Sequence, residues 1–231
     1  MMHSTISAVR LFGSAARGDD DGYSDVDLLV VQQESISKRE RLAIRKELSR
    51  FGENLSISWY SEKSLAKMFE EGHLFAVHLV KESARILSKP DFIDSLGAPK
   101  PYTHGSEDIA GFRSILEGVA PSLAASPRNA VFEAGLLYVT ARNVAMIASA
   151  YLPSGPFFGR ESPFQLDEEV GINFPLSRVE HRSNMLARTV GHRGIGVAVS
   201  EKEVFQMAKS LLGWTSQVQV FTNKMENIDA H

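Results

Sequence analysis

The sequence predicts a chain of two parts: an α/β (α+β) domain with a small mixed sheet, followed by an all-α helical bundle domain. Residues 6–88 alternate between strand and helix patterns, whereas the region after residue 105 shows helical periodicity and no convincing series of strands. Between them, the segment 97–101 holds a glycine and two prolines, which interrupt regular structure. We therefore expect a first domain at residues 1–96 and a second, companion domain at residues 105–231.

Strands and helices of the first domain follow from residue type and spacing. Strands are expected where β-branched and apolar residues cluster or alternate, at residues 8–12, 26–31, 55–60 and 84–87. Helices are expected where an apolar stripe follows a capping serine, at residues 37–51, 61–71 and 73–81. Ser37 or Ser35 would cap the first of these helices, and Ser61 the second.

The second domain is predicted to consist of helices. The strongest helical pattern covers residues 128–151, where alanines recur at steps of three and four residues and would let a neighbouring helix approach closely. Further helices are expected at residues 108–124, 174–190 and 200–221.

Composition narrows the class of protein. The chain has 231 residues, 43% of them hydrophobic and 23% charged, as in ordinary globular proteins. It contains no cysteine, which excludes disulfides and thiolate metal sites and fits a cytoplasmic location. The N-terminus has no basic and apolar leader pattern, and no apolar run approaches the length of a bilayer, so we expect neither a secretory signal nor a membrane partner.

The charge is close to balanced. The net charge is −3, with 14 Lys and Arg against 15 Asp and Glu in residues 1–100, and 11 against 13 in residues 101–231. Neither part is basic overall, so dedicated nucleic-acid binding is not expected. The predicted helix at 37–51 is locally basic, with six Lys and Arg. We interpret it as a solvated helix face, with attraction of a phosphate-rich substrate as the alternative.

The most informative motif lies between the first two predicted strands. The sequence FGSAARG at residues 12–18 is followed by SDVDL at residues 24–28. Alternate side chains of a strand share a face, so Asp25 and Asp27 should project together, and two adjacent carboxylates favour a cation between them. Oxygen ligands at this spacing suit Mg²⁺ with substrate phosphates, and the turn at Gly13 and Ser14 offers N–H and hydroxyl groups for phosphate oxygens.

These residues resemble the polymerase-β-type nucleotidyltransferase superfamily and its G-S-x-A-R-G…S-D-x-D-L signature. The likeness is closest to minimal and aminoglycoside nucleotidyltransferases, and it continues more weakly through residues 72–87. The resemblance implies transfer of NMP, most readily AMP from ATP, to a hydroxyl group, with release of pyrophosphate. It implies Asp25 and Asp27 as catalytic residues and Mg²⁺ ligands, and a nucleotide-binding set of Gly13, Ser14, Arg17 and Ser24. For Arg17, a surface arginine that caps the turn is an equal alternative.

The chain departs from this superfamily on the third predicted strand. Members usually carry a third carboxylate there, which completes the metal site and acts as the base. Here the strand offers Ser56 and Ser58, and we place Ser58 at the equivalent position; a serine hydroxyl is a poor metal ligand and no general base at neutral pH. Three outcomes stay open: another carboxylate such as Glu53 substitutes, the substrate or a partner chain supplies the base, or the protein is a nucleotide-binding sensor or antitoxin-like protein.

The second domain vaguely resembles the helical, HEPN-like domains that accompany such enzymes. HEPN ribonucleases separate an arginine and a histidine by four to six residues, whereas only three separate Arg188 from His192, so we expect no nuclease activity. Arg142 and Arg160 are expected to be buried or interface residues. The acceptor is not specified by the sequence: a small molecule and a protein hydroxyl are both compatible, and a homodimer is an open alternative.

Overall fold

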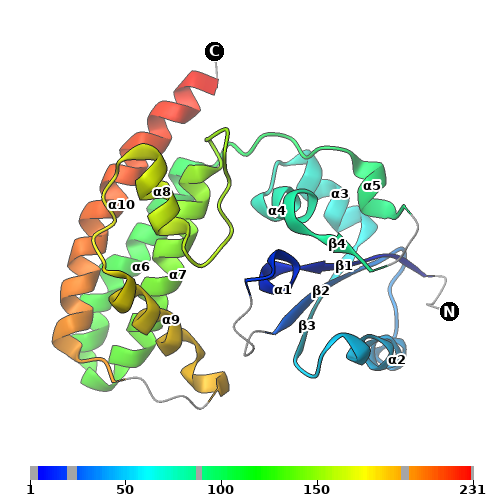
Figure 1. Cartoon of the computed structure of the whole chain (residues 1–231), viewed down its shortest axis with the longest axis horizontal. Coiled ribbons are helices and arrows are strands. Elements are labelled where there is room, and N and C mark those ends of the chain that lie inside the picture. The colour runs from blue at the N-terminus through cyan, green and yellow to red at the C-terminus, as the bar shows by residue number, and fades with distance from the viewer. Residues whose placement is uncertain (1–4, 20–24, 87–89, 194–197, 230–231) are drawn as a thin grey trace. The chain divides into compact units, whose positions relative to one another are not determined.

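The chain forms two compact units, Met1–Tyr102 and Thr103–His231 (Figure 1). The structure, a computed structural model, describes residues 5–19, 25–86, 90–193 and 198–229, without the side chains of 190–193 and 229. Each unit has its own core of buried hydrophobic residues.

A mixed four-stranded sheet forms the centre of the first unit. Its strands are β1 (Ile6–Phe12), β2 (Val26–Gln32), β3 (Leu55–Ser61) and β4 (Ala84–Arg85). They lie in the order β3-β2-β1-β4. β1 runs antiparallel to β2 and β4, and β2 runs parallel to β3. The predicted small mixed sheet is confirmed, and β4 is shorter than the predicted strand.

Five α-helices accompany the sheet in the described part of this unit. They are α1 (Gly13–Arg17), α2 (Lys38–Leu48), α3 (Glu62–Glu70), α4 (Leu74–Glu82) and α5 (Phe92–Leu96), and a 3₁₀ turn, η1 (Ser49–Phe51), follows α2. The predicted N-caps are confirmed: Ser37 forms a capping box with Glu40, and the Ser61 side chain accepts a hydrogen bond from the Ser64 N–H. Helix α5 was not predicted.

The helices cover both faces of the sheet (Figure 1). On one face, α3, α4 and α5 bury a core that includes Phe12, Leu29 and Leu65. On the other face, α2 buries a core that includes Leu28 and Ile44. Alternate side chains of each strand therefore enter opposite cores, as the period of two requires.

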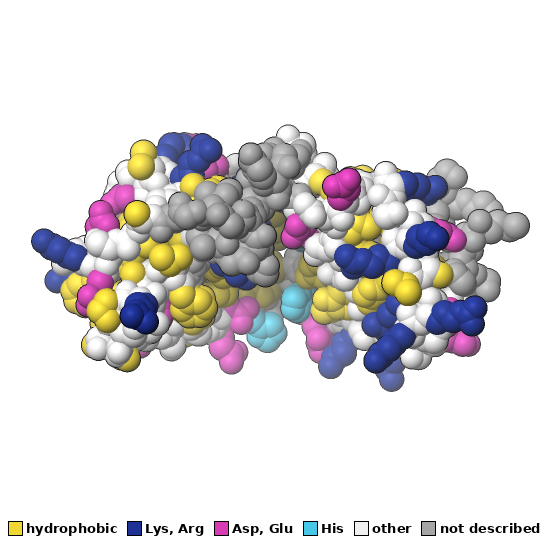
Figure 2. All heavy atoms as spheres, turned by 90° about the horizontal axis from the view of Figure 1, so that it is seen from below, with side chains coloured by type: hydrophobic (Ala, Val, Ile, Leu, Met, Phe, Trp, Pro, Cys, Tyr) yellow, Lys and Arg dark blue, Asp and Glu magenta, His cyan; other side chains and the backbone are white. Residues whose placement is uncertain are grey.

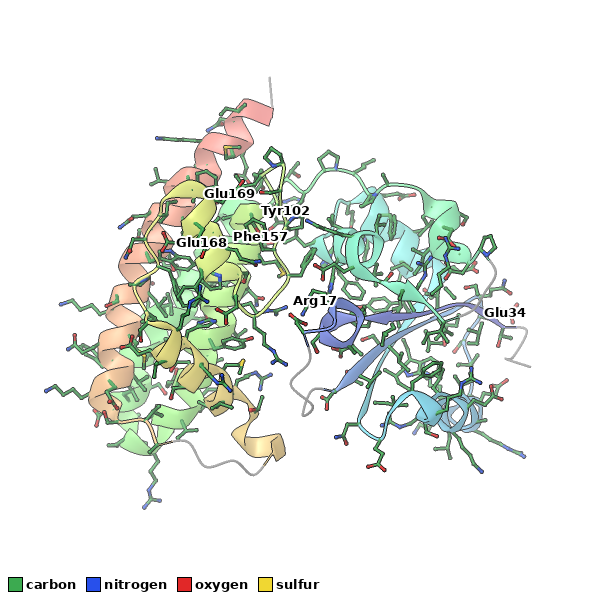
Figure 3. The ribbon with its side chains drawn as sticks, in the orientation of Figure 1. Arg17, Glu34, Tyr102, Phe157, Glu168 and Glu169 are labelled. Atoms are coloured by element: carbon green, nitrogen blue, oxygen red, sulfur yellow. The ribbon has the colours of Figure 1, made fainter. Side chains whose placement is uncertain are left out.

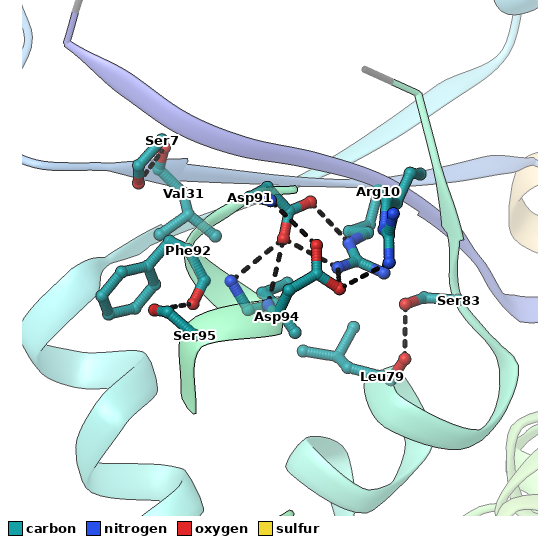
Figure 4. Close-up of polar contacts among 11 residues, drawn as sticks. Ser7, Arg10, Val31, Leu79, Ser83, Asp91, Phe92, Asp94 and Ser95 are labelled. Atoms are coloured by element: carbon teal, nitrogen blue, oxygen red, sulfur yellow. Dashed lines mark hydrogen bonds and ion pairs between the residues drawn. The ribbon is translucent and has the colours of Figure 1, made fainter. Parts of the chain in front are cut away.

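A buried ion pair fastens α5 to the sheet (Figure 4). The Arg10 guanidinium on β1 donates two hydrogen bonds of 2.7 Å to the Asp91 carboxylate and one of 2.8 Å to Asp94 Oδ1. The side chain of Asp91 is only 2% exposed. Burial lowers the pKa of Arg10, but the hydrogen bonds and charges of the two carboxylates outweigh it, so the pKa is raised above its usual value.

The predicted linker segment, 97–101, packs in part on the first unit. The Lys100 N–H donates to the Phe69 carbonyl at 2.9 Å. A Cβ atom on Gly72, which has φ of 67°, would lie 2.2 Å from the Pro101 carbonyl oxygen. This turn after α3 therefore admits the segment only because residue 72 is a glycine.

The described part of the second unit, residues 103–193 and 198–229, is helical and holds no strand. Its α-helices are α6 (Gly105–Ala125), α7 (Ala130–Ser149), α8 (Ser162–Val170), α9 (Arg178–Arg193) and α10 (Glu201–Asp229), with a 3₁₀ turn, η2 (Pro127–Asn129), before α7. The predicted all-α character is confirmed. Helix α8 was not predicted, α9 begins four residues later than expected, and α10 continues eight residues beyond its predicted end.

Helix α7 is the core helix of this unit. A Cβ atom on Gly135 would lie 2.9 Å from the Arg188 Cα atom, so the α7 and α9 backbones approach closely, as the run of small residues predicted. The segment Pro127–Ser149 has a mean hydropathy of 1.3 and is long and apolar enough to span a bilayer. This corrects the expectation that no apolar run reaches that length. Since 56% of the most apolar 18-residue stretch of this segment is buried within the structure, the segment fits a core helix of a globular unit.

Polar contacts join the two ends of the helical unit. The Tyr151 hydroxyl donates to Glu226 Oε1 at 2.6 Å and accepts the Gly105 N–H at 3.0 Å. The Ser106 N–H donates to the same Glu226 oxygen at 3.1 Å. The first N–H groups of α6, which have no partner within the helix, are thereby satisfied by residues far along the chain.

A buried histidine lies among aromatic rings in the helical unit. The His181 ring packs against Tyr138, Phe164 and Phe174, with ring centroids 5.1 to 5.6 Å apart. His181 Nε2 lies 2.9 Å from the Arg160 carbonyl oxygen. Burial lowers the pKa of His181, and the hydrogen bond to Arg160 offsets only part of this effect.

Candidate active site

The turn at the end of β1 lies against the side chain of Asp27. β1 ends at Phe12, and the chain turns at Gly13, which has φ of 74° and is buried. Phe12 and Asp27 are paired across β1 and β2. A Cβ atom on Gly13 would lie 2.5 Å from Asp27 Oδ2, so only glycine permits this approach as well as this backbone conformation.

The alternation along β2 fixes the side of the sheet on which Asp27 lies. Val26 packs in the core on the α2 side, whereas Phe12, the cross-strand partner of Asp27, packs in the core on the α3 and α4 side. Asp27, half-buried, therefore lies on the α3 and α4 side. Asp25 is exposed and directly precedes β2. If the alternation continues by one residue, Asp25 shares the face of Asp27, as predicted from the sequence.

The third strand places serines beside Asp27. In the parallel pairing of β2 and β3, Asp27 is opposite Ser56, and Leu29 is opposite Ser58. Both serines lie on the face of Asp27, with Ser56 in the adjacent position and Ser58 one step further along the strand. The sequence placed Ser58 at the third-carboxylate position, and this assignment stays a prediction; the register adds Ser56 as its nearest competitor.

The turn before β3 lies beside the start of β2. The Val26 N–H donates to the Asn54 carbonyl at 2.8 Å, and a Cβ atom on Gly52 would lie 2.9 Å from Val26 Cγ2. Glu53, which lies between Gly52 and Asn54 in the sequence, is exposed. It is therefore held near the strand end at which Asp25 and Asp27 lie, and it stays a candidate for the substitute carboxylate.

Arg17, labelled in Figure 3, belongs to α1 and contacts Glu82 of α4. Its Nη1 lies 3.0 Å from Glu82 Oε2, and its Nε lies 3.2 Å from Asp19 Oδ2. Burial lowers the pKa of Arg17, but the hydrogen bonds to Glu82 and Asp19 outweigh it, so the pKa is raised. The half-buried guanidinium of Arg17 thus links α1, which follows the Gly13 turn, to Glu82 of α4. Its predicted role in nucleotide binding stays a prediction.

Ser14 and Ser24 are the two remaining residues of the predicted nucleotide-binding set. The Ser14 carbonyl accepts the Asp19 N–H at 3.1 Å, and its side chain is half-buried at the start of α1. Ser24 lies outside the described residues. Phosphate binding by either residue stays a prediction.

Two residues of α4 that sequence reasoning passed over belong to this site. His78 Nε2 lies 3.2 Å from Glu82 Oε2, and the His78 ring packs edge-on against Phe12, with centroids 5.8 Å apart. Glu82 thereby connects Arg17 with His78. The signal was present in the sequence, because a histidine and a glutamate four residues apart share one face of a helix.

The donor set suits a hard cation held partly by its substrate. Among the residues that the structure describes, no group of three or more His, Cys, Asp and Glu side chains could hold a metal ion. Mg²⁺ needs fewer protein ligands, since one or two carboxylates with substrate phosphates and water complete its coordination. Asp25 and Asp27 fit this requirement. Since Gly13 has no Cβ atom, its own side chain does not occupy the position next to the Asp27 carboxylate.

The helical unit contributes no second catalytic motif in its described residues. Arg142 is half-buried, and its Nη2 donates to the Phe158 carbonyl at 2.7 Å. Arg188 is exposed, and the side chain of His192 lies outside the described residues. Helix α9 continues through both positions, with the three-residue separation noted above. The resemblance to HEPN domains beyond a helical fold stays a prediction.

A glycine turn packed against a strand carboxylate, in a small mixed sheet, defines the first unit as a nucleotidyltransferase-type domain. Residues 1–91 match the family described as "Polymerase beta, Nucleotidyltransferase". The first unit therefore belongs to the polymerase-β-type nucleotidyltransferase superfamily, as the sequence motif predicted. A search of curated proteins finds no match to the chain.

Proposed function

We propose that the protein is a Mg²⁺-dependent nucleotidyltransferase that transfers NMP, preferably AMP from ATP, to a hydroxyl group of a small molecule or a protein. The contact between the Gly13 turn and the Asp27 carboxylate, inside a domain of the nucleotidyltransferase family, is the observation that supports this proposal most strongly. The acceptor oxygen attacks the α-phosphorus, the bond from that phosphorus to the β-phosphate oxygen breaks, and pyrophosphate leaves. The hydroxyl proton passes to a base.

The residues of the proposed site bind the metal ion, bind the phosphates or hold α1 in position. Asp25 and Asp27 would hold Mg²⁺, which, when bound, supplies positive charge to the phosphates. The Gly13 turn and the Ser14 hydroxyl bind phosphate oxygens of the nucleotide. Arg17 keeps α1 in position through Glu82. Most of the rate enhancement then arises from positioning and from preorganised charge.

The second candidate function is a nucleotide-binding sensor, or antitoxin-like protein, with little catalysis. Its support is the neighbour of Asp27 on β3, which is Ser56 instead of a carboxylate, with Ser58 beyond it. The carboxylate pair argues against a protein that only binds a partner chain, which would have no need for two repelling groups side by side, although binding of Mg²⁺ with a nucleotide would use them. The two functions differ in one chemical requirement, a base for the acceptor hydroxyl.

The transfer test uses the whole protein with ATP labelled at the α-phosphate, Mg²⁺ and a cell lysate. Label is scored separately on proteins, RNA and small molecules, and ATP labelled at the γ-phosphate is the control, because that label leaves with pyrophosphate. We expect label above that of the lysate alone only from α-labelled ATP, and loss of at least about a hundredfold of this label for Asp27→Asn, the usual scale for a group that stabilises charge. Equal labelling by wild type and Asp27→Asn would contradict the proposed site.

The base is tested by a matched pair of variants, Ser56→Asp and Ser58→Asp. If the wild type binds ATP but transfers nothing, and one variant transfers AMP, the sensor reading holds and the active variant marks the vacant position. If the wild type is active, a new carboxylate should be neutral or harmful, because it repels Asp25 and Asp27. ATP binding, measured by the rise in Tm with ATP and Mg²⁺, serves as the control for folding of each variant.

A further inference from the structure

Helix α2 carries a concentration of exposed positive charge. Its outer surface, together with η1, presents six exposed cationic side chains, which we call the basic face: Lys38, Arg39, Arg41, Arg45, Lys46 and Arg50. Only two carboxylates, Glu40 and Glu47, lie in the same stretch. Figure 2 shows the first unit from the α2 side, with many Lys and Arg side chains in dark blue. The whole chain is slightly acidic, so this feature is local and is hidden in the total charge.

The basic face is not neutralised by carboxylates. Within the described parts of the chain, no ion pair joins any of the six cations to an Asp or Glu side chain. Glu40 is engaged elsewhere, since its Oε2 accepts hydrogen bonds from the Ser37 N–H at 2.8 Å and the Ser37 hydroxyl at 2.7 Å. By contrast, Arg10 and Arg17 in the same unit each contact two carboxylates.

Three guanidinium groups of the basic face are held in position by neighbouring groups. The Arg41 guanidinium lies 5.2 Å from the centre of the Trp59 ring, and that of Arg50 lies 4.9 Å from the centre of the Phe51 ring. Arg45 Nη2 donates to the Leu55 carbonyl at 3.1 Å. Cation–π contacts and this hydrogen bond reduce the freedom of the side chains before any ligand binds, which lowers the entropic cost of binding.

We propose that the basic face of α2 is a docking surface for single-stranded RNA. Unpaired cations along a helix complement a chain of phosphates, and flat guanidinium and aromatic groups beside them can stack with unpaired bases. Phe51 is 38% exposed and lies at the end of this surface. The inference concerns binding and is independent of the proposed nucleotidyl transfer.

The arrangement favours RNA over an anionic membrane. A helix that lies in a bilayer interface needs a free apolar face. The apolar face of α2, with Ile44 and Leu48, is buried against the sheet. On the outer side, Leu42 is the one apolar side chain of α2 among the large exposed hydrophobics of the described residues, at 69%. With Phe51 on η1, the surface has only two large exposed apolar side chains, too few for the free apolar face of an interfacial helix, so the phosphate charge of a polynucleotide is the better complement.

The test measures binding of a fluorescently labelled 20-nucleotide uridine RNA to the whole protein by anisotropy, between 50 and 200 mM salt. If about four phosphates are neutralised, the slope of log K against log salt is about −3. The variant Arg39→Glu with Lys46→Glu reverses two exposed charges that form no ion pair or cation–π contact among the described residues, and should weaken binding at least about tenfold. The control, Lys63→Glu with Lys209→Glu, makes the same change of net charge at exposed sites elsewhere and should alter binding less than about twofold.

Three results would overturn the inference: no salt-dependent binding of the RNA, equal weakening by the control pair, or tighter binding of the matching 20-base-pair duplex. Binding to vesicles with 30% anionic lipid but not to RNA would assign the surface to a membrane instead. Asp25→Asn with Asp27→Asn should leave RNA binding unchanged. That variant separates failure of the docking surface from failure of the proposed transfer reaction.

Discussion

The two units handle buried polar groups differently. In the first unit, the buried charge of Arg10 is matched by two carboxylates from a distant segment, and the Asp27 carboxylate lies against a glycine turn. In the helical unit, two polar side chains within the fold are neutral: buried His181 has a lowered pKa among aromatic rings, and half-buried Tyr151 shares its hydroxyl between a carboxylate and a backbone N–H. Stability of the first unit should therefore depend on paired charges, and that of the second on keeping such groups uncharged.

The largest expected effect breaks the charged pair of the first unit. Arg10→Met leaves the Asp91 carboxylate buried without its cation and should destabilise this unit by about 3–5 kcal/mol. Urea unfolding followed by the fluorescence of Trp59 in this unit and Trp214 in the other, each studied in a variant that lacks the second tryptophan, resolves the two units. The exposed pair of Arg113 and Glu117 in α6 is the control, and Arg113→Ala should cost less than about 0.5 kcal/mol. Equal losses would remove the distinction between the units.

The second effect separates backbone strain from the carboxylate contact. Gly13 and Gly18 have nearly the same φ, 74° and 73°, but a Cβ atom on Gly18 meets nothing within 4 Å. Gly13→Ala and Gly18→Ala should each cost about 1 kcal/mol of stability through strain. Only Gly13→Ala should also displace Asp27, which should lower AMP transfer by at least about tenfold and reduce the Mg²⁺-dependent rise in Tm with ATP. Similar losses of function in both variants would show that the Asp27 contact does not matter.

The third effect tests the hydrogen bonds of the Tyr151 hydroxyl with Gly105 and Glu226 in the helical unit. Tyr151→Phe removes the hydroxyl between Gly105 and Glu226 and leaves a donor and an acceptor without this partner, which should cost about 1–3 kcal/mol. Ser114→Ala removes an exposed hydroxyl of α6 and should change the free energy of unfolding by less than about 0.5 kcal/mol. Urea unfolding followed at Trp214 gives both values. A loss confined to the Trp59 signal would refute the assignment of these hydrogen bonds to the helical unit.

The smallest effect is the pH dependence of the helical unit. Because the pKa of His181 is lowered in the folded state, the unfolded chain binds a proton first as the pH falls. The stability that neutral His181 contributes is present above about pH 6.5 and decreases below it, by at most about 1.4 kcal/mol per pH unit. Unfolding of the helical unit between pH 7.5 and 5 should show this slope in the wild type and a smaller one in His181→Gln. Ser114→Ala, at an exposed side chain that does not titrate, should keep the wild-type slope.

Much of the first unit could be predicted because its signals are local. Alternation and β-branching located three of its strands, and serine caps located the starts of α2 and α3. The glycine and aspartate motif indicated the family that the match at residues 1–91 bears out. These patterns lie within windows of a few residues, in which spacing alone determines which side chains share a face.

The remaining features depend on distant partners or on short segments. Helix α5 has five residues, too few for a clear apolar period, and α8 buries only Ser162, Pro163 and Leu166, so its sequence shows no apolar stripe. The Arg10 and Asp91 pair spans 81 residues, and nothing near either residue in the sequence marks the other. The register that puts Ser56 beside Asp27 depends on a parallel pairing across the α2 connection, which a single-strand pattern cannot specify.

The same 81-residue separation has a consequence for how the protein is made. During synthesis β1 leaves the ribosome before α5, and Arg10 then has no buried partner until Asp91 follows it. At about 5–20 residues per second, the delay is about 4–16 seconds. Throughout that interval the central strand of the sheet lacks the carboxylates that neutralise its cation. Completion of the first unit is thereby tied to the synthesis of its last helix, and a nascent chain stalled before residue 91 would present an incomplete fold to chaperones and proteases.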